Sequence, residues 1–224
     1  MIAENIEKIR SEIPDGVRLI AVSKLKPVED IQEAYAAGQR LFGENYATEL
    51  RDKAAVLSKD IEWHFIGHLQ GKQLKYYIPF VSMIHGVDSI EHLEEVEKAA
   101  AKVNRTVDVL LQVHVAQEET KFGFSPEELE KYQFSSSNFQ FVRICGLMAM
   151  ASNTTDRSRV RADFREAKRI FDSLKVGVFK DNAAFVELSM GMSHDWQIAV
   201  EEGSTLIRLG TSIFGPRDYN KTKI

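Results

Sequence analysis

Eight short runs of apolar and β-branched residues alternate with longer charged segments, and this alternation constrains the fold more than any other feature of the chain. The runs cover residues 17–23, 41–44, 62–67, 83–87, 107–115, 142–150, 185–190 and 205–209. Helical spacing is found in segments 2–13, 28–37, 46–57, 89–103, 126–132 and 158–174. Several runs are continuously apolar, which is typical of parallel strands covered by helices.

The length of the chain fits a barrel built from these units. Dividing 224 residues among eight strands gives 224/8 = 28 residues per unit, enough for a strand, a helix and two short loops. The pattern therefore predicts an α/β fold, a closed (β/α)₈ TIM barrel with an extra N-terminal helix, formed by residues 1–224 as one domain. A doubly wound open sheet is the alternative.

Composition excludes several classes of protein. Hydrophobic residues make up 44% of the chain, and the formal net charge is −4, so no basic surface for nucleic acid or an anionic membrane is expected. The single cysteine, Cys145, excludes a disulfide framework and a multi-cysteine metal site. The charged N-terminal segment has no secretory apolar stretch. We expect a soluble, cytoplasmic protein.

A lysine follows the first predicted strand, where a barrel enzyme places its active site. If the alternation of the strand continues, Lys24 points into the mouth of the barrel. Partial desolvation there favours the neutral amine, which attacks carbonyl groups. Lys26 lies on the same face of the strand and is the competing candidate, and a surface lysine in a loop is the alternative interpretation.

Small and hydroxyl residues follow the seventh and eighth predicted strands. The two segments contain Ser189, Gly191 and Ser193, and then Gly210, Thr211 and Ser212. Exposed backbone N–H groups near helix N-termini hold phosphate, and barrel enzymes bind phosphate at these two loops. Ordinary turns and helix caps would use the same residue types. We predict a phosphate site here.

A reactive lysine opposite a phosphate site suits a phosphorylated aldehyde held as a Schiff base. Pyridoxal 5′-phosphate is the first candidate, and a Schiff-base aldolase acting on a sugar phosphate is the alternative. Arg208, just before the last loop, could then sit near the cofactor ring. Arginine stays charged, so it would keep the pyridine nitrogen unprotonated and weaken the ring as an electron sink. Asn45, after the second strand, could bind a ligand oxygen or cap a helix.

No metal site is predicted. His64 and His68 lie four residues apart in an extended run, which separates them by about 13 Å. The segment from Gly67 to Lys72 has the wrong spacing for a P-loop, and Gln73 stands where that motif needs Ser or Thr.

Several motifs together resemble the YggS/PROSC family of pyridoxal phosphate homeostasis proteins, which are related to the N-terminal barrel of alanine racemase. The motifs are AVSKLKP at 21–27, FGENY at 42–46, WHFIGHLQ at 63–70, GLMAM at 146–150, LSMGMS at 188–193, RLGT at 208–211 and IFG at 213–215. They follow one another in order along nearly the whole chain.

The resemblance implies a role for particular residues. Lys24 would carry pyridoxal phosphate as a Schiff base, and Arg208 would face the pyridine nitrogen. Asn45 would line the pocket near the ring, and Met148 would pack against the cofactor. The phosphate would be bound by Ser189, Gly191, Gly210 and Thr211, with help from Ser193.

The sequence departs from the family pattern at three places. These are Gly71-Lys72-Gln73, where Ser-Asn-Lys is common, His114, where Asn is usual, and Phe122, where a small residue is usual. The roles of the loops after the third and fifth strands therefore do not carry over, whereas the lysine and phosphate segments are intact.

The resemblance implies intracellular homeostasis of pyridoxal phosphate, by buffering and delivery, without an established catalytic turnover. An amino acid racemase is the alternative, but racemisation needs a second base opposite Lys24. Tyr46 and Tyr219 are available, and nothing in the sequence puts either one there. We expect a monomer that exchanges the cofactor with apoenzymes and binds neither nucleic acid nor membrane.

Overall fold

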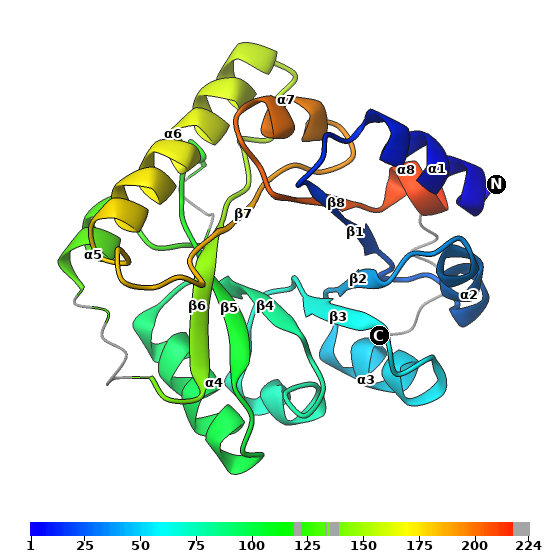
Figure 1. Ribbon diagram of the computed structural model, residues 1–224, viewed down its shortest axis with the longest axis horizontal. Coiled ribbons are helices and arrows are strands. Elements are labelled where there is room, and N and C mark those ends of the chain that lie inside the picture. Colours follow the sequence, from blue (N-terminus) through cyan, green and yellow to red (C-terminus); the bar gives the residue numbers. More distant parts are fainter. Residues whose placement is uncertain (119–121, 133, 135–138, 217–224) are drawn as a thin grey trace.

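The protein forms a closed barrel of eight parallel strands, with helices around its outside, in the computed structural model (Figure 1). The structure describes residues 1–118, 122–132, 134 and 139–216. The strands follow one another around the barrel in chain order, and β8 pairs with β1 to close it. The predicted (β/α)₈ barrel is confirmed, and the open sheet is wrong.

The elements lie close to the predicted segments. The strands are β1 Arg18–Val22, β2 Leu41–Glu44, β3 Glu62–Phe65, β4 Met83–Val87, β5 Val107–Gln112, β6 Val142–Met148, β7 Glu187–Ser189 and β8 Leu206–Leu209. The α-helices are α1 Ile2–Glu12, α2 Val28–Ala36, α3 Ala47–Val56, α4 Ile90–Lys102, α5 Pro126–Lys131, α6 Arg157–Val176, α7 Trp196–Glu201 and α8 Thr211–Phe214. A 3₁₀-helix, η1 (Gly71–Tyr76), follows β3.

Side-chain caps fix where several helices begin. Ser89 accepts a hydrogen bond from the His92 amide at the start of α4, at 3.1 Å. Asp156 caps α6, and Ser125 with Glu128 forms a capping box at α5. These residues are the signals by which helix starts can be read from a sequence.

The alternation along the strands divides the barrel into two layers of packing. Ile20, Leu110 and Leu206 belong to a small apolar cluster inside the barrel, whereas Leu19, Ala21 and their counterparts pack under the helices. Polar side chains share the interior. Those nearly or fully buried include His64, His85, Ser189 and Arg208.

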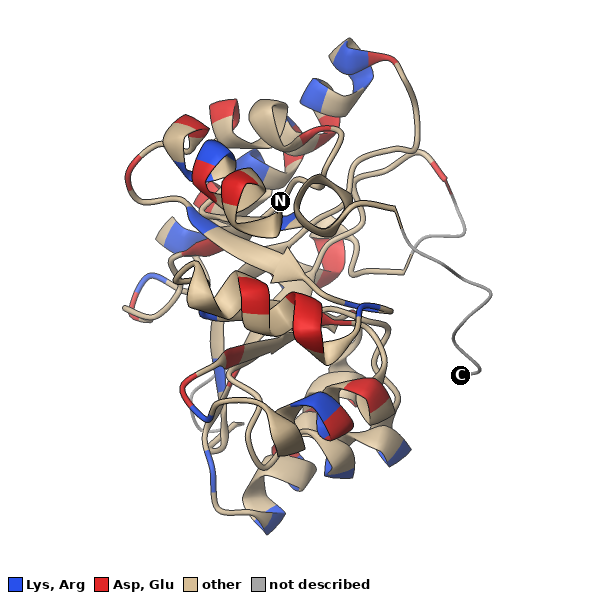
Figure 2. Cartoon of the chain, turned by 90° about the vertical axis from the view of Figure 1, so that its right-hand side faces the viewer, with Lys and Arg blue, Asp and Glu red and all other residues tan. Residues whose placement is uncertain are grey.

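The outer helices carry most of the charge, with both signs interspersed around the barrel (Figure 2). The first helix joins the end of the fold, since the Asn5 amide donates to the Ile213 carbonyl of α8 at 2.9 Å. Among the residues described, no helix combines the length and apolar character needed to cross a membrane.

Candidate active site

A cavity of about 250 Å³ opens at the carboxyl ends of the strands. It is lined by Val22, Lys24, Asn45, Ile66, Met148, Met150, Met192, Ser193, His194, Arg208, Gly210 and Thr211. Of the nine predicted site residues, seven therefore lie around one cavity: Lys24, Asn45, Met148, Ser193, Arg208, Gly210 and Thr211. Lys26 does not line it, because its ammonium donates to the Phe214 and Pro216 carbonyls, both at 2.8 Å.

The backbone on both sides of Lys24 is held by buried groups. The Ser23 hydroxyl donates to Glu44 Oε1 at 2.6 Å. On the other side, the Leu25 amide donates to Glu49 Oε1 at 2.7 Å. Leu25 has φ = 59°, in the left-handed region, which costs a side-chain-bearing residue about 1–2 kcal/mol. The chain thus reverses sharply after Lys24 and holds the turn by hydrogen bonds.

Lys53 of α3 joins the two carboxylates that hold this turn. Its ammonium donates to Glu44 Oε1 at 2.8 Å, to Glu49 Oε1 at 2.7 Å and to the Ser23 carbonyl at 2.8 Å. All three donors of the ammonium are used. We call Glu44, Lys53 and Glu49 the buried triad, in which the Glu49 side chain is 19% exposed and the other two are buried. It connects α3 and β2 to the segment that carries Lys24.

The buried triad contains one carboxyl group with a strongly shifted pKa. Burial raises the pKa of Glu44 to about 7, and the nearby Lys53 opposes this rise. One oxygen of each carboxylate, Glu44 Oε2 and Glu49 Oε2, is buried without a hydrogen-bond partner among the described residues. Desolvation and like charge therefore strain the triad, and the lysine between the carboxylates compensates for both.

The loops after β7 and β8 meet on one side of the cavity. The Ser193 hydroxyl oxygen accepts hydrogen bonds from the amides of Gly210 and Ser212, at 3.3 and 3.4 Å. These two bonds bring the hydroxyl of one loop against the backbone donors of the other. Ser193, Gly210 and Thr211 are thus close enough to share a ligand.

Arg208 lies between these loops and the interior of the barrel. Its side chain is 5% exposed, and its guanidinium donates to the Ser189 hydroxyl at 2.5 Å and to the Ala149 carbonyl at 3.1 Å. Burial lowers the pKa of Arg208 to about 10, and Asp195 opposes this change. A pKa near 10 leaves the guanidinium charged at neutral pH.

Asn45, which follows β2, and Met148, which ends β6, complete the cavity wall from opposite sides of the barrel. Asn45 Oδ1 is buried without a hydrogen-bond partner among the described residues, so this side chain has bonding capacity left for a ligand. Its backbone packs closely on β3: a Cβ on Gly67 would lie 2.1 Å from the Asn45 carbonyl oxygen. Met148 ends β6 and is 3% exposed.

Two predicted phosphate ligands lie outside the cavity lining. Ser189 is fully buried below the cavity and bonds to Arg208 and His85. Gly191 has φ = 91°, and a Cβ there would come within 2.9 Å of Trp196 Cα, so this glycine allows the loop to pack on α7. Ser189 thus contacts the cavity-lining Arg208, and Gly191 contacts α7, so both residues support the cavity without lining it.

Sequence reasoning missed several residues that the structure brings to the site or close beneath it. Met192 and His194 line the cavity, and the buried triad and the pair His64–His85 lie behind it. His85 is a polar residue in the middle of an apolar strand, MIHGV, and this was a readable signal. Glu49 and Lys53 have a spacing common on exposed helix surfaces, so the sequence does not distinguish them.

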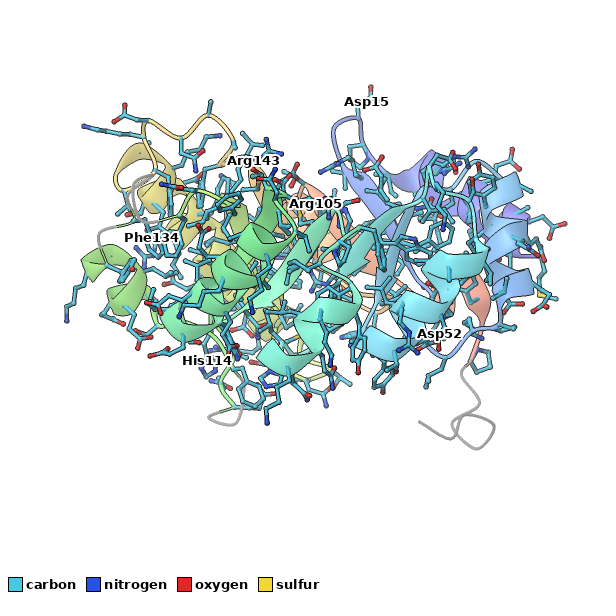
Figure 3. The ribbon with its side chains drawn as sticks, turned by 90° about the horizontal axis from the view of Figure 1, so that it is seen from below. Asp15, Asp52, Arg105, His114, Phe134 and Arg143 are labelled. Atoms are coloured by element: carbon cyan, nitrogen blue, oxygen red, sulfur yellow. The ribbon has the colours of Figure 1, made fainter. Side chains whose placement is uncertain are left out.

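The departures from the family pattern lie beside the cavity and outside its lining. Gly71 to Gln73 begin η1, and Phe122 is 60% exposed with its ring centroid 4.5 Å from that of His68. Figure 3 shows His114 toward the opposite end of the barrel from Arg143. In the described part of the chain, no cluster of His, Cys, Asp or Glu is arranged to hold a metal. Tyr219 lies outside the described residues.

Cys145 is buried inside the barrel. Burial raises the pKa of its thiol to about 12, so the thiolate that reacts with oxidants is scarce at neutral pH.

The donor set of the cavity fits pyridoxal phosphate. An amine, a charged guanidinium, and paired hydroxyl and amide groups match an aldehyde, a ring nitrogen and a phosphate, and they surround one cavity. The unpaired amide oxygen of Asn45 adds a buried polar atom that is left for a ligand.

Comparisons with known proteins agree with this fit. The sequence profile described as "Alanine racemase, N-terminal domain" matches residues 1–218. The pyridoxal phosphate homeostasis protein of Aquifex aeolicus is 38% identical over 222 residues, covering 97% of this chain and 96% of that protein. The mouse (Mus musculus) protein of the same name is 40% identical over 220 residues, covering 91% and 78%.

A solved structure is similar over almost the whole chain. PipY of Synechococcus elongatus PCC7942, with PLP bound, has a TM-score of 0.88 and 38% identity. The match covers 96% of this chain and 100% of that one.

Proposed function

Because this chain belongs to the pyridoxal phosphate homeostasis proteins, within the alanine racemase N-terminal domain family, we propose that it binds pyridoxal 5′-phosphate and buffers and delivers it. The observation that carries the proposal is the meeting of Lys24, Arg208 and the loops after β7 and β8 around one cavity. The bound cofactor supplies an aldehyde that combines reversibly with amines. Reversibility is what a buffer requires.

Each predicted site residue has a role in this proposal. Lys24 forms the Schiff base, and the turn held by the buried triad orients its amine. Ser193, Gly210 and Thr211 bind the phosphate through hydroxyl and backbone donors. Asn45 and Met148 contact the ring from the wall of the cavity. Ser189 and Gly191 act on the site through Arg208 and α7.

The charge on Arg208 argues against chemistry that demands a strongly stabilised carbanion. A guanidinium that remains protonated cannot accept a proton and keeps a facing ring nitrogen unprotonated, so carbanions are poorly stabilised. Racemisation also needs a second base opposite the lysine. Tyr46 lies outside the residues that line the cavity. We expect no significant racemisation of amino acids.

The proposal also covers the location, the oligomeric state and the partners of the protein. We propose that it acts in the cytoplasm as a monomer and passes the cofactor to apoenzymes. Transfer measured from the loaded protein to an apoenzyme, with and without a dialysis membrane between them, separates direct contact from release into solution.

An absorbance spectrum tests the central step. The wild-type protein incubated with pyridoxal phosphate should gain a visible band that borohydride abolishes. Lys24→Ala should lack this band, and Lys26→Ala should retain it because Lys26 bonds to backbone carbonyls outside the cavity. A colourless wild-type protein that traps a sugar phosphate on reduction would instead support the aldolase. A full band in Lys24→Ala would refute the lysine assignment.

A further inference from the structure

A chain of buried hydrogen bonds runs from Arg208 through the inside of the barrel. The guanidinium donates to Ser189 Oγ at 2.5 Å, and this oxygen lies 3.1 Å from His85 Nδ1. His85 Nε2 lies 2.9 Å from His64 Nδ1. The four side chains are at most 5% exposed, and their residues come from β8, β7, β4 and β3.

The chemistry of arginine sets the direction of this chain. A guanidinium can only donate, so Ser189 Oγ accepts from Arg208. The Ser189 hydroxyl must then donate its own hydrogen, and His85 Nδ1 is the acceptor that the described structure offers. If His85 Nδ1 carried a hydrogen, the Ser189 hydrogen would be buried without an acceptor, which is unfavourable.

The same reasoning fixes which ring nitrogen carries the hydrogen in each of the two imidazoles. With Nδ1 as an acceptor, neutral His85 carries its hydrogen on Nε2 and donates to His64 Nδ1. His64 then carries its hydrogen on Nε2 as well. His64 also lines a cavity of about 280 Å³ at the amino-terminal mouth, together with the ion pairs Arg18–Glu187 and Arg143–Asp108. In every hydrogen bond of the chain, the donor is therefore the group nearer to Arg208, and the acceptor is the group nearer to the amino-terminal mouth.

Such a chain supports a buried guanidinium that is near Asp195 but makes no direct ion pair among the described residues. Within the described residues, no carboxylate lies at ion-pair distance from Arg208, although its guanidinium is buried. A hydroxyl that donates onward becomes a better acceptor, so the two histidines strengthen the bond at the guanidinium. Burial lowers the pKa of His64 to about 3 and that of His85 well below its ordinary value, consistent with neutral rings.

We propose that His85 and His64 are positioning residues for Arg208, and that both are held as Nε2–H tautomers in a one-way chain of hydrogen bonds. The consequence for the cofactor rests on the proposed function. The tautomers and the constraint on Arg208 do not, because they are properties of the protein alone.

Long-range ¹H–¹⁵N NMR of the cofactor-free protein tests the tautomers directly. His64 and His85 should both show the Nε2–H pattern at pH 7, with assignments from single His variants. An Nδ1–H pattern or a doubly protonated ring at either position would overturn the proposal. For this measurement, only the His variants used for assignment need to be stable.

A matched pair of variants tests the action on Arg208. His85→Asn keeps an acceptor near the position of Nδ1, whereas His85→Leu has a similar size and offers none. In the cofactor-free protein, the guanidinium hydrogens of Arg208 should exchange with solvent about tenfold faster in His85→Leu, and His85→Asn should restore most of the protection. Equal exchange in His85→Leu and the wild type, or no rescue by Asn, would contradict the positioning role.

The loaded protein provides the link to function. His85→Leu should bind pyridoxal phosphate about tenfold more weakly and move the pH midpoint of the visible band, with His85→Asn close to the wild type. Loss of binding in the wild type would count against the proposed function alone. Unchanged affinity and midpoint in His85→Leu would count against the positioning role alone.

Discussion

The residues on either side of Lys24 fix the backbone that carries its amine. Ser23 and Leu25 each bond to a carboxylate of the buried triad, and Lys53 holds both carboxylates. The triad therefore acts on the lysine through its neighbours. A buried charged group of this kind contributes more to specificity of geometry than to net stability.

Removing the ammonium of the triad should be costly. Lys53→Met leaves buried Glu44 and half-buried Glu49 without their cation, and we expect the free energy of unfolding at pH 7.5 to fall by about 3–5 kcal/mol. At pH 5 the loss should be smaller, because Glu44 then binds a proton. Urea denaturation at both pH values measures this.

Lys98→Met is the control for this change. Lys98 also pairs with a glutamate four residues away, but its side chain is 72% exposed, so we expect a loss below about 0.5 kcal/mol. Equal losses in the two variants would show that the triad is no stronger than a surface ion pair.

Lys24 could be predicted from the sequence because the strand alternation continues two residues beyond the end of β1. Val22 and Lys24 both line the cavity, as a period of two requires. The buried triad could not be predicted in the same way. Glu44 ends a strand and Lys53 lies in a helix, and only the packing of α3 on the turn after β1 brings them together.

At the scale of elements, close contact between strand ends shapes the cavity. Gly67 follows β3 and touches the backbone of Asn45, which follows β2. The residue therefore has to be glycine for steric reasons: the contact leaves no space for a side chain. The strands themselves were readable from periodicity, whereas η1 and α8 were not, because η1 is a 3₁₀-helix without the α-helical spacing and α8 has only four residues.

Enlarging Gly67 should damage both the fold and the site. In Gly67→Ala the Cβ would lie 2.1 Å from a backbone oxygen, so the ends of β2 and β3 must move apart. We expect a loss of about 2–4 kcal/mol in the free energy of unfolding, together with weaker binding of pyridoxal phosphate because Asn45 shifts. Denaturation and a binding titration measure the two effects.

Gly16→Ala separates steric contact from backbone strain. Gly16 has φ = 88°, but nothing lies within 4 Å of an added Cβ, so only the conformational cost of about 1–2 kcal/mol remains. Its binding of the cofactor should equal that of the wild type. If Gly67→Ala behaved in the same way, the close approach at Asn45 would not matter for the site.

At the scale of the whole molecule, buried ionisable groups make stability depend on pH. His64 has a native pKa of about 3, below its ordinary 6.5, and His85 is shifted in the same direction. The unfolded chain then binds protons that the native protein does not. Their contribution to stability is complete above pH 6.5 and is lost as the pH falls toward 3.

Glu44 acts with the opposite sign. Its native pKa of about 7 exceeds the ordinary 4.5, so its contribution is complete below pH 4.5 and is lost as the pH rises through 7. Between pH 4.5 and 6.5, acidification lowers the free energy of unfolding through the two histidines and raises it through the one glutamate. The free energy of unfolding should therefore decrease on acidification over this range, because the histidine contribution outweighs that of the glutamate.

Urea denaturation between pH 6.5 and 4.5 measures this slope. His64→Leu should flatten it, because one of the two histidine contributions is removed. A slope that is the same in this variant and the wild type would show that His64 is not the group responsible.

The pairing of β1 with β8 brings Ile20 beside Arg208, so the two sides of the cavity come from opposite ends of the chain. During synthesis, a ribosome that has completed only seven strands has not yet made Arg208 or the turn after β8 that we propose binds the phosphate. The cavity is therefore complete, and the proposed binding of pyridoxal phosphate possible, only after translation has passed Thr211. A chain truncated before β8 should therefore lack the visible band after incubation with pyridoxal phosphate. The band then marks chains that contain β8.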